Sequence, residues 1–386
     1  MSKVFIEETT LTNIGSAIRE KTGKTDLIAP GDMPAEIKAI VSGGGSGGGN
    51  EPTAEELTLT GNCEYRFANG GWDWIVEKYG DKMTTKDITD AKYMFSDSNL
   101  ERIPFDLNFD STEEVEVSSL LCMINLKEVP KINGLKPSKI DYIFSNCQSL
   151  RELSWESVKD IDWSYIESQT SGSASPRKNT FTYCYSLRSF PIEFLNHGNP
   201  YSSNSNGIYQ NLFQACRCLD EVIDLPVLHN QASWTSNGFY YTFRDCCRLK
   251  NLTFKLQDNG TPYVRSKWSK QAIDLTTNVG YVTSSATITN TNGGITADKL
   301  VTDDASYQAL KNDPDWFTTN MAYSRYNHDS AVATINSLPD LSGGAGSNSI
   351  KFKGAAGSAT DGGAINTLTE EEIAVAAAKG WTVSFA

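Results

Sequence analysis

Cysteine is the residue type in this sequence best suited to chemistry, and four of the eight cysteines recur at one position of a repeated pattern. Each follows a phenylalanine by three residues and precedes a leucine by three residues; the four are Cys147, Cys184, Cys216 and Cys246. Such thiols could be buried as small apolar side chains, form disulfides between neighbouring copies, or bind a metal. The remaining cysteine spacings are too irregular for a C-x-x-C metal framework. We therefore expect buried free thiols, with disulfides and a metal site as alternatives.

Other patterns that could support catalysis are weak. The three histidines, His197, His229 and His328, are not spaced as zinc ligands. Residues 23–25, Gly-Lys-Thr, resemble the end of a phosphate-binding loop, but Ile18 stands where the first glycine is needed. The acidic pairs 160/162 and 303/304 fit solvated surface better than catalytic carboxylates. The sequence therefore predicts no enzyme activity, no cofactor and no metal.

The pattern that carries the cysteines recurs six times and predicts the fold. Its leucines lie at positions 100, 126, 150, 187, 219 and 249, and two looser copies begin at Met94, with Asp97 in the cysteine position, and at Leu120, with Met123 there. One copy has too little apolar surface to bury alone, whereas stacked copies share a continuous core. We predict a mainly β fold with short helices: a leucine-rich-repeat-like parallel solenoid, preceded by a small helical N-terminal module.

The repeat, written F-x-x-C-x-S-L-x-x-I, resembles the BspA-type leucine-rich repeat over roughly residues 58–260. The resemblance implies a curved parallel solenoid with one strand in each turn, and a role in binding or adhesion. It names no ligand. The first two copies lack the cysteine, and long insertions separate some of the others.

The first 41 residues predict two short amphipathic helices, at residues 8–22 and 33–41, joined by a turn-rich connection. Their apolar residues are Leu11, Ile14, Ile18, Met33, Ile37 and Ile40. Two small helices cannot bury such stripes alone, so we expect this module to attach to another protein or to copies of itself. The alternative is docking on the solenoid. Residues 42–50 are nearly all glycine and serine and predict a flexible linker.

Two elements of this leader, A-I-R-E-K-T-G and M-P-x-x-I-x-x-I, are similar to N-terminal modules of phage tail-fibre and baseplate proteins. The resemblance implies a virion protein made in the host cytoplasm, attached by residues 1–41 to other phage tail or baseplate proteins. It also implies a homotrimer whose distal part binds a host cell-surface glycan or protein. A polysaccharide-degrading tail spike and a bacterial surface adhesin are the alternatives. The lack of a secretory signal at the N-terminus counts against the adhesin.

Charge and composition restrict the partners. The chain has 34 basic and 47 acidic residues, a formal net charge of −13. Such a charge disfavours nucleic acid or an anionic membrane surface as the main partner. No apolar run is long enough to predict membrane insertion.

Beyond the linker we expect three regions. Residues 51–92 are expected to cap the stack, residues 93–260 to form the solenoid, and residues 261–386 to form irregular final turns and a C-terminal cap. The last region predicts strands near residues 286–289 and 348–354 and a short helix at 332–338. It ends in a helix at residues 373–379 that follows a capping box at Thr369–Glu372, and a strand at 381–385 after Gly380.

Aromatic residues in the insertions are the candidates for receptor binding. They are Trp163, Tyr165, Tyr201, Tyr209, Trp234, Tyr240 and Tyr241. Rigid aromatic rings among serine and asparagine are typical of binding loops, and a flat apolar face beside amides also suits sugars. The alternative is that half or more of these rings pack the insertions onto the stack.

Overall fold

The structure is a computed structural model. It describes residues 57–168, 178–197, 209–228, 239–246, 248–257, 272–276, 286–290, 297–301, 318–320, 326–343, 348–352 and 368–385. The chain divides into two compact units, Met1–Leu59 and Thr60–Ala386. The expected helices of residues 1–41, with the six apolar attachment residues, and the linker at 42–50 lie outside the described residues.

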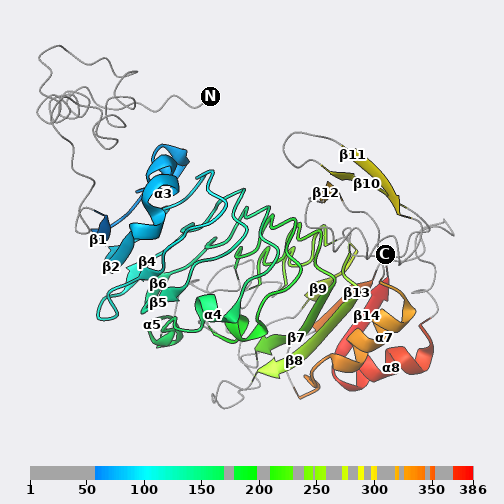
Figure 1. The fold of residues 1–386 in the computed structure, drawn as a ribbon. Coiled ribbons are helices and arrows are strands. Elements are labelled where there is room, and N and C mark those ends of the chain that lie inside the picture. Colours follow the sequence, from blue (N-terminus) through cyan, green and yellow to red (C-terminus); the bar gives the residue numbers. More distant parts are fainter. Residues whose placement is uncertain are drawn as a thin grey trace, which may run out of the picture. The chain divides into compact units, whose positions relative to one another are not determined.

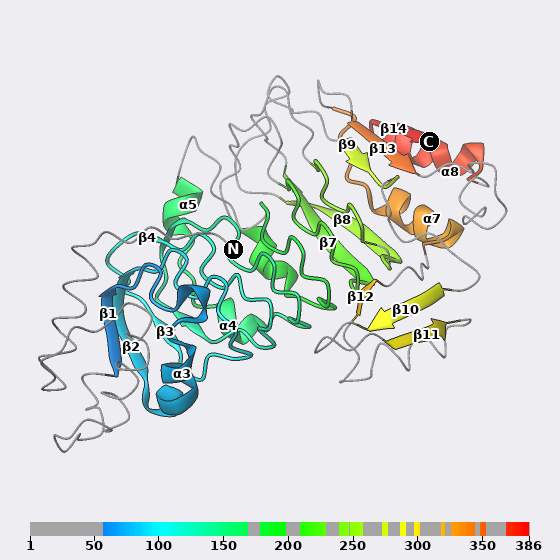
Figure 2. The same cartoon turned by 90° about the horizontal axis from the view of Figure 1, so that it is seen from above.

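Seven copies of one turn follow one another along the described chain (Figures 1 and 2). Each copy has a buried central residue, here called the anchor: Phe67, Phe95, Leu121, Phe144, Phe181, Phe213 and Phe243. In five of the copies the N–H of the anchor donates to the carbonyl of the residue before the next anchor. This bond measures 2.7 Å from Phe67 to Met94 and 3.0 Å from Phe181 to Leu212. The bonds hold each copy against the next one.

Left-handed backbone recurs two residues before every anchor, at what we call the edge position. The edge residues are Tyr65, Tyr93, Ser119, Tyr142, Asn179, Asn211 and Tyr241, with φ between 53° and 64°. In most copies a second left-handed residue, such as Asn146 or Tyr183, lies two after the anchor. The backbone N–H groups of the left-handed residues point to the next copy. For example, the Tyr93 N–H donates to the Ser118 carbonyl, and the Asp97 N–H donates to the Cys122 carbonyl.

Stacked rings fill the interior of the copies. Phe67 and Phe95 stack with centroids 5.0 Å apart, and Phe181 stacks on Phe144 and on Phe213 at 5.8 Å each. The repeat leucines are buried, and Leu150 and Leu187 are completely so. The buried residues of neighbouring copies thus pack against one another.

The register of the two looser copies differs from the prediction by one residue. Their anchors are Phe95 and Leu121, not Met94 and Leu120, as the anchor hydrogen bonds show. Asp97 is a left-handed turn residue rather than the counterpart of the cysteines; Ser98 takes that place, donating its N–H to Phe95 as Cys147 does to Phe144. These copies have one residue fewer between the anchor and the leucine than the later copies do. Counting a fixed distance back from the leucine therefore placed the anchor one residue too early in the sequence.

Strands in the copies are short and parallel. Strand β3 (Leu107–Asn108) pairs with β5 (Ile132–Asn133), and β4 (Val115–Glu116) pairs with β6 (Pro137–Lys139). The longest pair is β7 (Glu221–Leu228) with β8 (Asn251–Gln257). Short helices lie in the connections: α4 (Trp155–Val158), α5 (Ser164–Ser168) and the 3-10 helix η3 (Ile192–Asn196). The described fold therefore combines short helices with small parallel sheets.

The first described elements are β1 (Thr58–Asn62) and β2 (Thr84–Asp90), which form a two-stranded sheet. Between them lie η1 (Ala68–Gly70), helix α3 (Asp73–Tyr79) and η2 (Gly80–Lys82). Asp73 is buried and joins α3 to the following copy: it accepts from the Ser98 hydroxyl and from the Asn99 N–H, each at 2.7 Å.

The C-terminal part has two three-stranded sheets. In one, β13 (Asn348–Phe352) is parallel to both β9 (Ala272–Asp274) and β14 (Trp381–Phe385). In the other, β10 (Ala286–Asn290) is antiparallel to β11 (Ala297–Val301) and β12 (Thr318–Asn320).

Two helices complete this part. Helix α8 (Glu370–Ala378) begins at the predicted capping box of Thr369 and Glu372, and Gly380 follows it with φ 81°. Helix α7 (His328–Ser337) starts four residues before the predicted position, because Asn327 caps it. Thr334 of α7 donates to the carbonyl of Leu252 in β8 at 2.7 Å, which ties α7 to the last repeat strand.

Candidate functional site

The edge positions bring a series of tyrosines to the surface. Tyr65, Tyr142 and Tyr241 are 54%, 44% and 41% exposed, and Tyr93 is half-buried. Tyr183, at the second left-handed position of its copy, is 41% exposed. We call these five residues the tyrosine edge. These tyrosine side chains are partly exposed, whereas the neighbouring anchors are buried.

Cations and further rings surround the tyrosine edge. Tyr65 stacks on Tyr93 with centroids 4.9 Å apart. The Lys92 ammonium lies 5.5 Å from the Tyr93 ring, and the Arg244 guanidinium lies 5.0 Å from the Tyr241 ring. Cations over aromatic faces help to hold the rings in place. The edge therefore presents partly exposed tyrosine rings with cationic groups beside them.

The pKa of one tyrosine of the edge, Tyr142, is shifted. Burial raises the pKa of Tyr142, and the neighbouring Asp141 raises it further. The phenol therefore stays neutral at physiological pH and can both donate and accept a hydrogen bond.

Asp141 itself is buried beside the edge, and burial raises the pKa of its carboxyl group; Lys178 and Lys139 oppose this shift. Its Oδ1 has no hydrogen-bond partner within the described residues. A carboxyl group with a raised pKa in such a place can act as a general acid.

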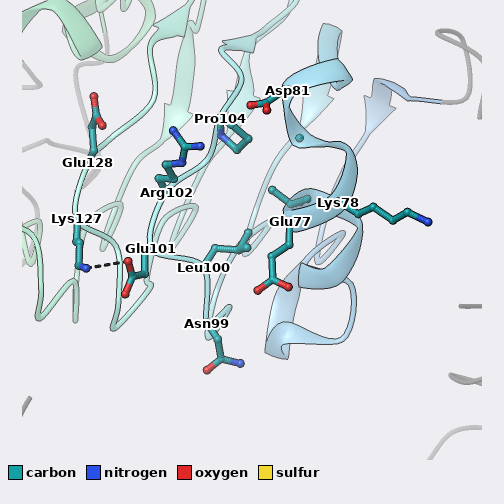
Figure 3. A pocket seen from close by; sticks show the side chains of 12 residues that line it. Glu77, Lys78, Asp81, Asn99, Leu100, Glu101, Arg102, Pro104, Lys127 and Glu128 are labelled. Carbon is teal, nitrogen blue, oxygen red and sulfur yellow. Dashed lines mark hydrogen bonds and ion pairs between the residues drawn. The ribbon is translucent and has the colours of Figure 1, made fainter. Parts of the chain in front are cut away.

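A second surface feature is a charged groove between α3 and the first copies (Figure 3). It consists of two adjoining pockets of about 550 and 770 Å³, which share Arg102, Pro104, Lys127 and Glu128. In Figure 3 the ion pair between Lys127 and Glu101, at 2.8 Å, crosses from one copy to the next. Both side chains are more than 60% exposed, so this pair contributes little to stability. Charged side chains line the groove together with apolar surface of similar extent.

The predicted receptor-binding residues fall into three groups. Tyr241 lies on the tyrosine edge, with Tyr240 packed against it at 4.1 Å between centroids, and Tyr165 is half-buried in α5. Tyr201 and Trp234 lie outside the described residues.

Trp163 and Tyr209 were wrongly predicted to be exposed. Trp163 is 5% exposed, because its ring stacks on His197 at 5.4 Å and meets the edge of Phe194 at 5.5 Å. Tyr209 is fully buried; its ring stacks on Phe239 and its hydroxyl donates to the Pro226 carbonyl. Both rings pack insertions onto the stack, as the alternative interpretation held.

Sequence reasoning missed four members of the tyrosine edge: Tyr65, Tyr93, Tyr142 and Tyr183. A signal for the first three was available, since Tyr-x-Phe occurs at residues 65–67, 93–95, 142–144 and 241–243, and Asn-x-Phe at 179–181 and 211–213. Tyrosine, asparagine and, once, serine occupy this position, whose backbone is left-handed in each of the seven described copies.

The described cysteines are free thiols. All seven described cysteines are free, and Cys147, Cys184, Cys216 and Cys246 are fully buried as predicted. Within the described part of the chain, no group of three or more His, Cys, Asp or Glu side chains is placed to hold a metal ion. In the same residues, no helix has the length and apolar character needed to cross a membrane.

Comparison with known proteins finds no family model, no curated protein and no solved structure that matches this chain. The family resemblances therefore rest on the sequence motifs alone.

Proposed function

We propose that this chain is a bacteriophage tail-fibre protein that binds a host cell-surface glycan through its tyrosine edge. In this proposal the stacked copies form a leucine-rich-repeat-like parallel solenoid without enzymatic activity. Residues 1–41 attach the chain to other tail or baseplate proteins of the virion, and the chain acts as a homotrimer.

The observation that carries the proposal is the presence of tyrosine at left-handed positions. A left-handed backbone costs about 1–2 kcal/mol for most residue types, and asparagine tolerates it best. Asn179 and Asn211 fill the same position in their copies, where their side chains hydrogen-bond each other at 2.9 Å. Asparagine can thus occupy the left-handed edge position of a copy. A tyrosine that is strained and exposed at this position is best explained by the use of its side chain.

The chemistry of the edge suits a sugar ligand. A tyrosine ring packs against the apolar face of a sugar ring, and a neutral hydroxyl such as that of Tyr142 can hydrogen-bond sugar hydroxyl groups. Repetition along the copies lets several weak contacts act together on a polymeric glycan, and assembly into a trimer multiplies them again.

The test replaces edge tyrosines by asparagine, which relieves the backbone while removing the ring. We expect Tyr142→Asn to unfold at the same or a higher temperature than the wild type. Binding to an array of bacterial surface polysaccharides should weaken about tenfold, and more when Tyr241→Asn is added. The matched control is Trp72→Asn, which removes a 38% exposed ring that is not one of the five tyrosines of the edge. Unchanged binding in the double variant would refute the edge as the site, and an array without any bound glycan would refute the glycan as the ligand.

Asp141 favours one alternative, the polysaccharide-degrading tail spike, because its carboxyl group has a raised pKa and lies next to the tyrosine edge. Incubation of bound polysaccharides with the protein should then release reducing ends, and Asp141→Asn should abolish the release but keep binding. The tail-fibre proposal predicts no release.

A further inference from the structure

Three neighbouring copies carry a half-buried side chain at the same position, four residues after the anchor and two before the repeat leucine. These residues are Gln148, Tyr185 and Arg217. The N–H of Ser186 donates to the Gln148 carbonyl at 3.2 Å, and the N–H of Cys218 donates to the Tyr185 carbonyl at 3.0 Å. Because these bonds join one copy to the next, the three side chains belong to adjacent copies.

Tyr185 is the centre of a group of side-chain contacts. The Arg217 guanidinium lies over the Tyr185 ring, 4.8 Å from its centroid. The rings of Tyr183 and Tyr185 meet in a T-shaped arrangement with centroids 6.2 Å apart. Tyr183 belongs to the tyrosine edge and is 41% exposed. We call Tyr183, Tyr185 and Arg217 the arginine–tyrosine cluster; it joins a guanidinium to an exposed ring of the edge.

Tyr183 occupies a backbone conformation that tyrosine disfavours. Its φ is 62°, and the equivalent residue, two after the anchor, is also left-handed in five other copies. Those five residues are Asn69, Asp97, Asn146, Ala215 and Asp245. Asparagine and aspartate tolerate this conformation best among residues other than glycine, and tyrosine has no such advantage. An exposed tyrosine at this position is best explained by the use of its ring.

The arginine of the cluster lies among uncharged residues of the three copies. Residues 145–148, 182–185 and 214–217, which follow the three anchors, contain one charged side chain, that of Arg217. A single cation beside tyrosine rings thus distinguishes this part of the edge.

Arg217 also differs from the cations over the other edge tyrosines. Lys92 lies 3.5 Å from Glu116, and Arg244 lies 3.7 Å from Asp245, so both have an acidic partner. Within the described part of the chain, Arg217 forms no ion pair, and its guanidinium contacts the Tyr185 ring. Its N–H donors therefore remain available for a ligand from solution.

We propose that the arginine–tyrosine cluster binds a negatively charged sugar residue through its carboxylate or phosphate group. A tyrosine ring packs against the apolar face of a sugar, and a guanidinium presents a planar set of donors that matches either anion. The contact with Tyr185 restricts the guanidinium before binding, so less conformational freedom is lost when the ligand binds. The inference rests on the proposed function and adds that the tyrosine edge selects an acidic glycan over a neutral one.

The test compares tetramers of galacturonic acid with the same tetramers after methyl esterification, which removes the charge and keeps the sugar rings. Isothermal titration calorimetry on the full chain measures both dissociation constants at one ionic strength, because salt screens the repulsion from the net charge of −13. We expect the acid to bind about tenfold more tightly than the ester. Arg217→Gln should abolish this preference. Arg217→Lys, which keeps the charge but loses the planar donors, should reduce it.

The matched control is Arg102→Gln, which removes an exposed arginine of the charged groove and should keep the preference for the acid. Circular dichroism verifies that each variant is folded. Galactose phosphate tests the other source of the anion: binding to the wild type but not to Arg217→Gln would assign a sugar phosphate. The proposal is overturned if neither charged probe binds, or if Arg217→Gln keeps the preference of the wild type.

This inference and the glycan proposal can fail separately. Tyr142→Asn and Tyr241→Asn should weaken binding of the acid and the ester alike, because they remove rings but no charge. An unchanged preference in Arg217→Gln, with weaker binding in the tyrosine variants, would refute the charged subsite alone. A lost preference in Arg217→Gln, with unchanged binding in the tyrosine variants, would refute the contribution of Tyr142 and Tyr241 alone.

Discussion

The thiol of Cys184 donates a hydrogen bond to the carbonyl oxygen of Phe144 at 3.0 Å, across 40 residues of sequence. Phe144 is the anchor of the preceding copy. The same bond joins Cys147 to Leu121, Cys216 to Phe181 and Cys246 to Phe213, at 2.7–3.1 Å. The repeated cysteine thus connects neighbouring copies through a buried hydrogen bond rather than through a disulfide.

Removing one of these thiols should destabilise the stack. Cys184→Ala loses the hydrogen bond to Phe144 and leaves a small cavity, and we expect the free energy of unfolding to fall by about 1–3 kcal/mol. Denaturation in guanidinium chloride measures this difference. The control is Ser189→Ala, which replaces an exposed side chain two residues after the repeat leucine of the same copy. It should leave the free energy of unfolding unchanged. An unchanged midpoint for Cys184→Ala would contradict a structural role of the thiol.

The repeat thiols should be unreactive in the folded protein. Burial raises the pKa of Cys147, Cys184 and Cys216 well above the ordinary value, and it raises that of Cys122 to about 12. Because the thiolate is the reactive form, iodoacetamide at pH 8 should label none of these four without unfolding. Peptide mass spectrometry identifies the labelled sites. The same residues should react rapidly in guanidinium chloride, and fast labelling of Cys184 in the native protein would argue against its burial.

Asp73 should be needed for docking of α3. Asp73→Ala removes two hydrogen bonds from a buried carboxylate and leaves the Ser98 hydroxyl and the Asn99 N–H without their partner. We expect a loss of about 2–4 kcal/mol in the free energy of unfolding, or local exchange of the α3 amides. Asp81→Ala, at an exposed position of η2, is the matched control. Equal stability of the two variants would show that Asp73 is not the contact that holds α3.

The contact between His328 and Glu372 should make the C-terminal helices sensitive to pH. The His328 Nε2 and Glu372 Oε2 atoms are 3.1 Å apart. The hydrogen bond with Glu372 raises the pKa of His328, while the Thr369 N–H is the main cause that lowers the pKa of Glu372. The contribution of His328 to the free energy of unfolding is therefore complete below the ordinary histidine pKa of 6.5. It is lost as the pH rises through the raised pKa of the folded state. The contribution of Glu372 to the free energy of unfolding is present above its ordinary pKa of 4.5 and is lost as the pH falls through the lowered pKa of the folded state.

The variant His328→Gln tests this contact. Its Tm should fall below that of the wild type at about pH 5.5, and the two values should converge at about pH 9, where the histidine is neutral. Differential scanning calorimetry at both pH values gives the comparison. A Tm difference that is the same at both pH values would exclude the charged pair as its cause.

Assembly can be tested by light scattering on the full chain and on a chain that starts at Asn50. Under the tail-fibre proposal the full chain is a trimer, and the shortened chain is a monomer because it lacks the apolar stripes of residues 1–41. If both the full chain and the shortened chain are monomers, the N-terminal module docks on a different protein, or the tail-fibre proposal is wrong.

The sequence determined the local features of this protein. The Phe, Cys and Leu of the repeat could be assigned to the core from their spacing, and the caps of α8 could be assigned from Thr369, Glu372 and Gly380, because such signals act within a few residues. The tyrosine edge was also encoded, in the repeated Tyr-x-Phe, but its left-handed backbone could not be deduced from tyrosine, which disfavours that conformation.

Only the tertiary structure decided which aromatic side chains are exposed and which charges meet. Trp163 is buried by Phe194, and Tyr209 by Phe239 and Pro226, all of them distant in sequence. The register of the first copies and the ion pair between Arg248 and Asp220 likewise depend on which residues face each other across copies. Exposure and pairing are properties of contacts between distant segments, and spacing within one segment does not contain them.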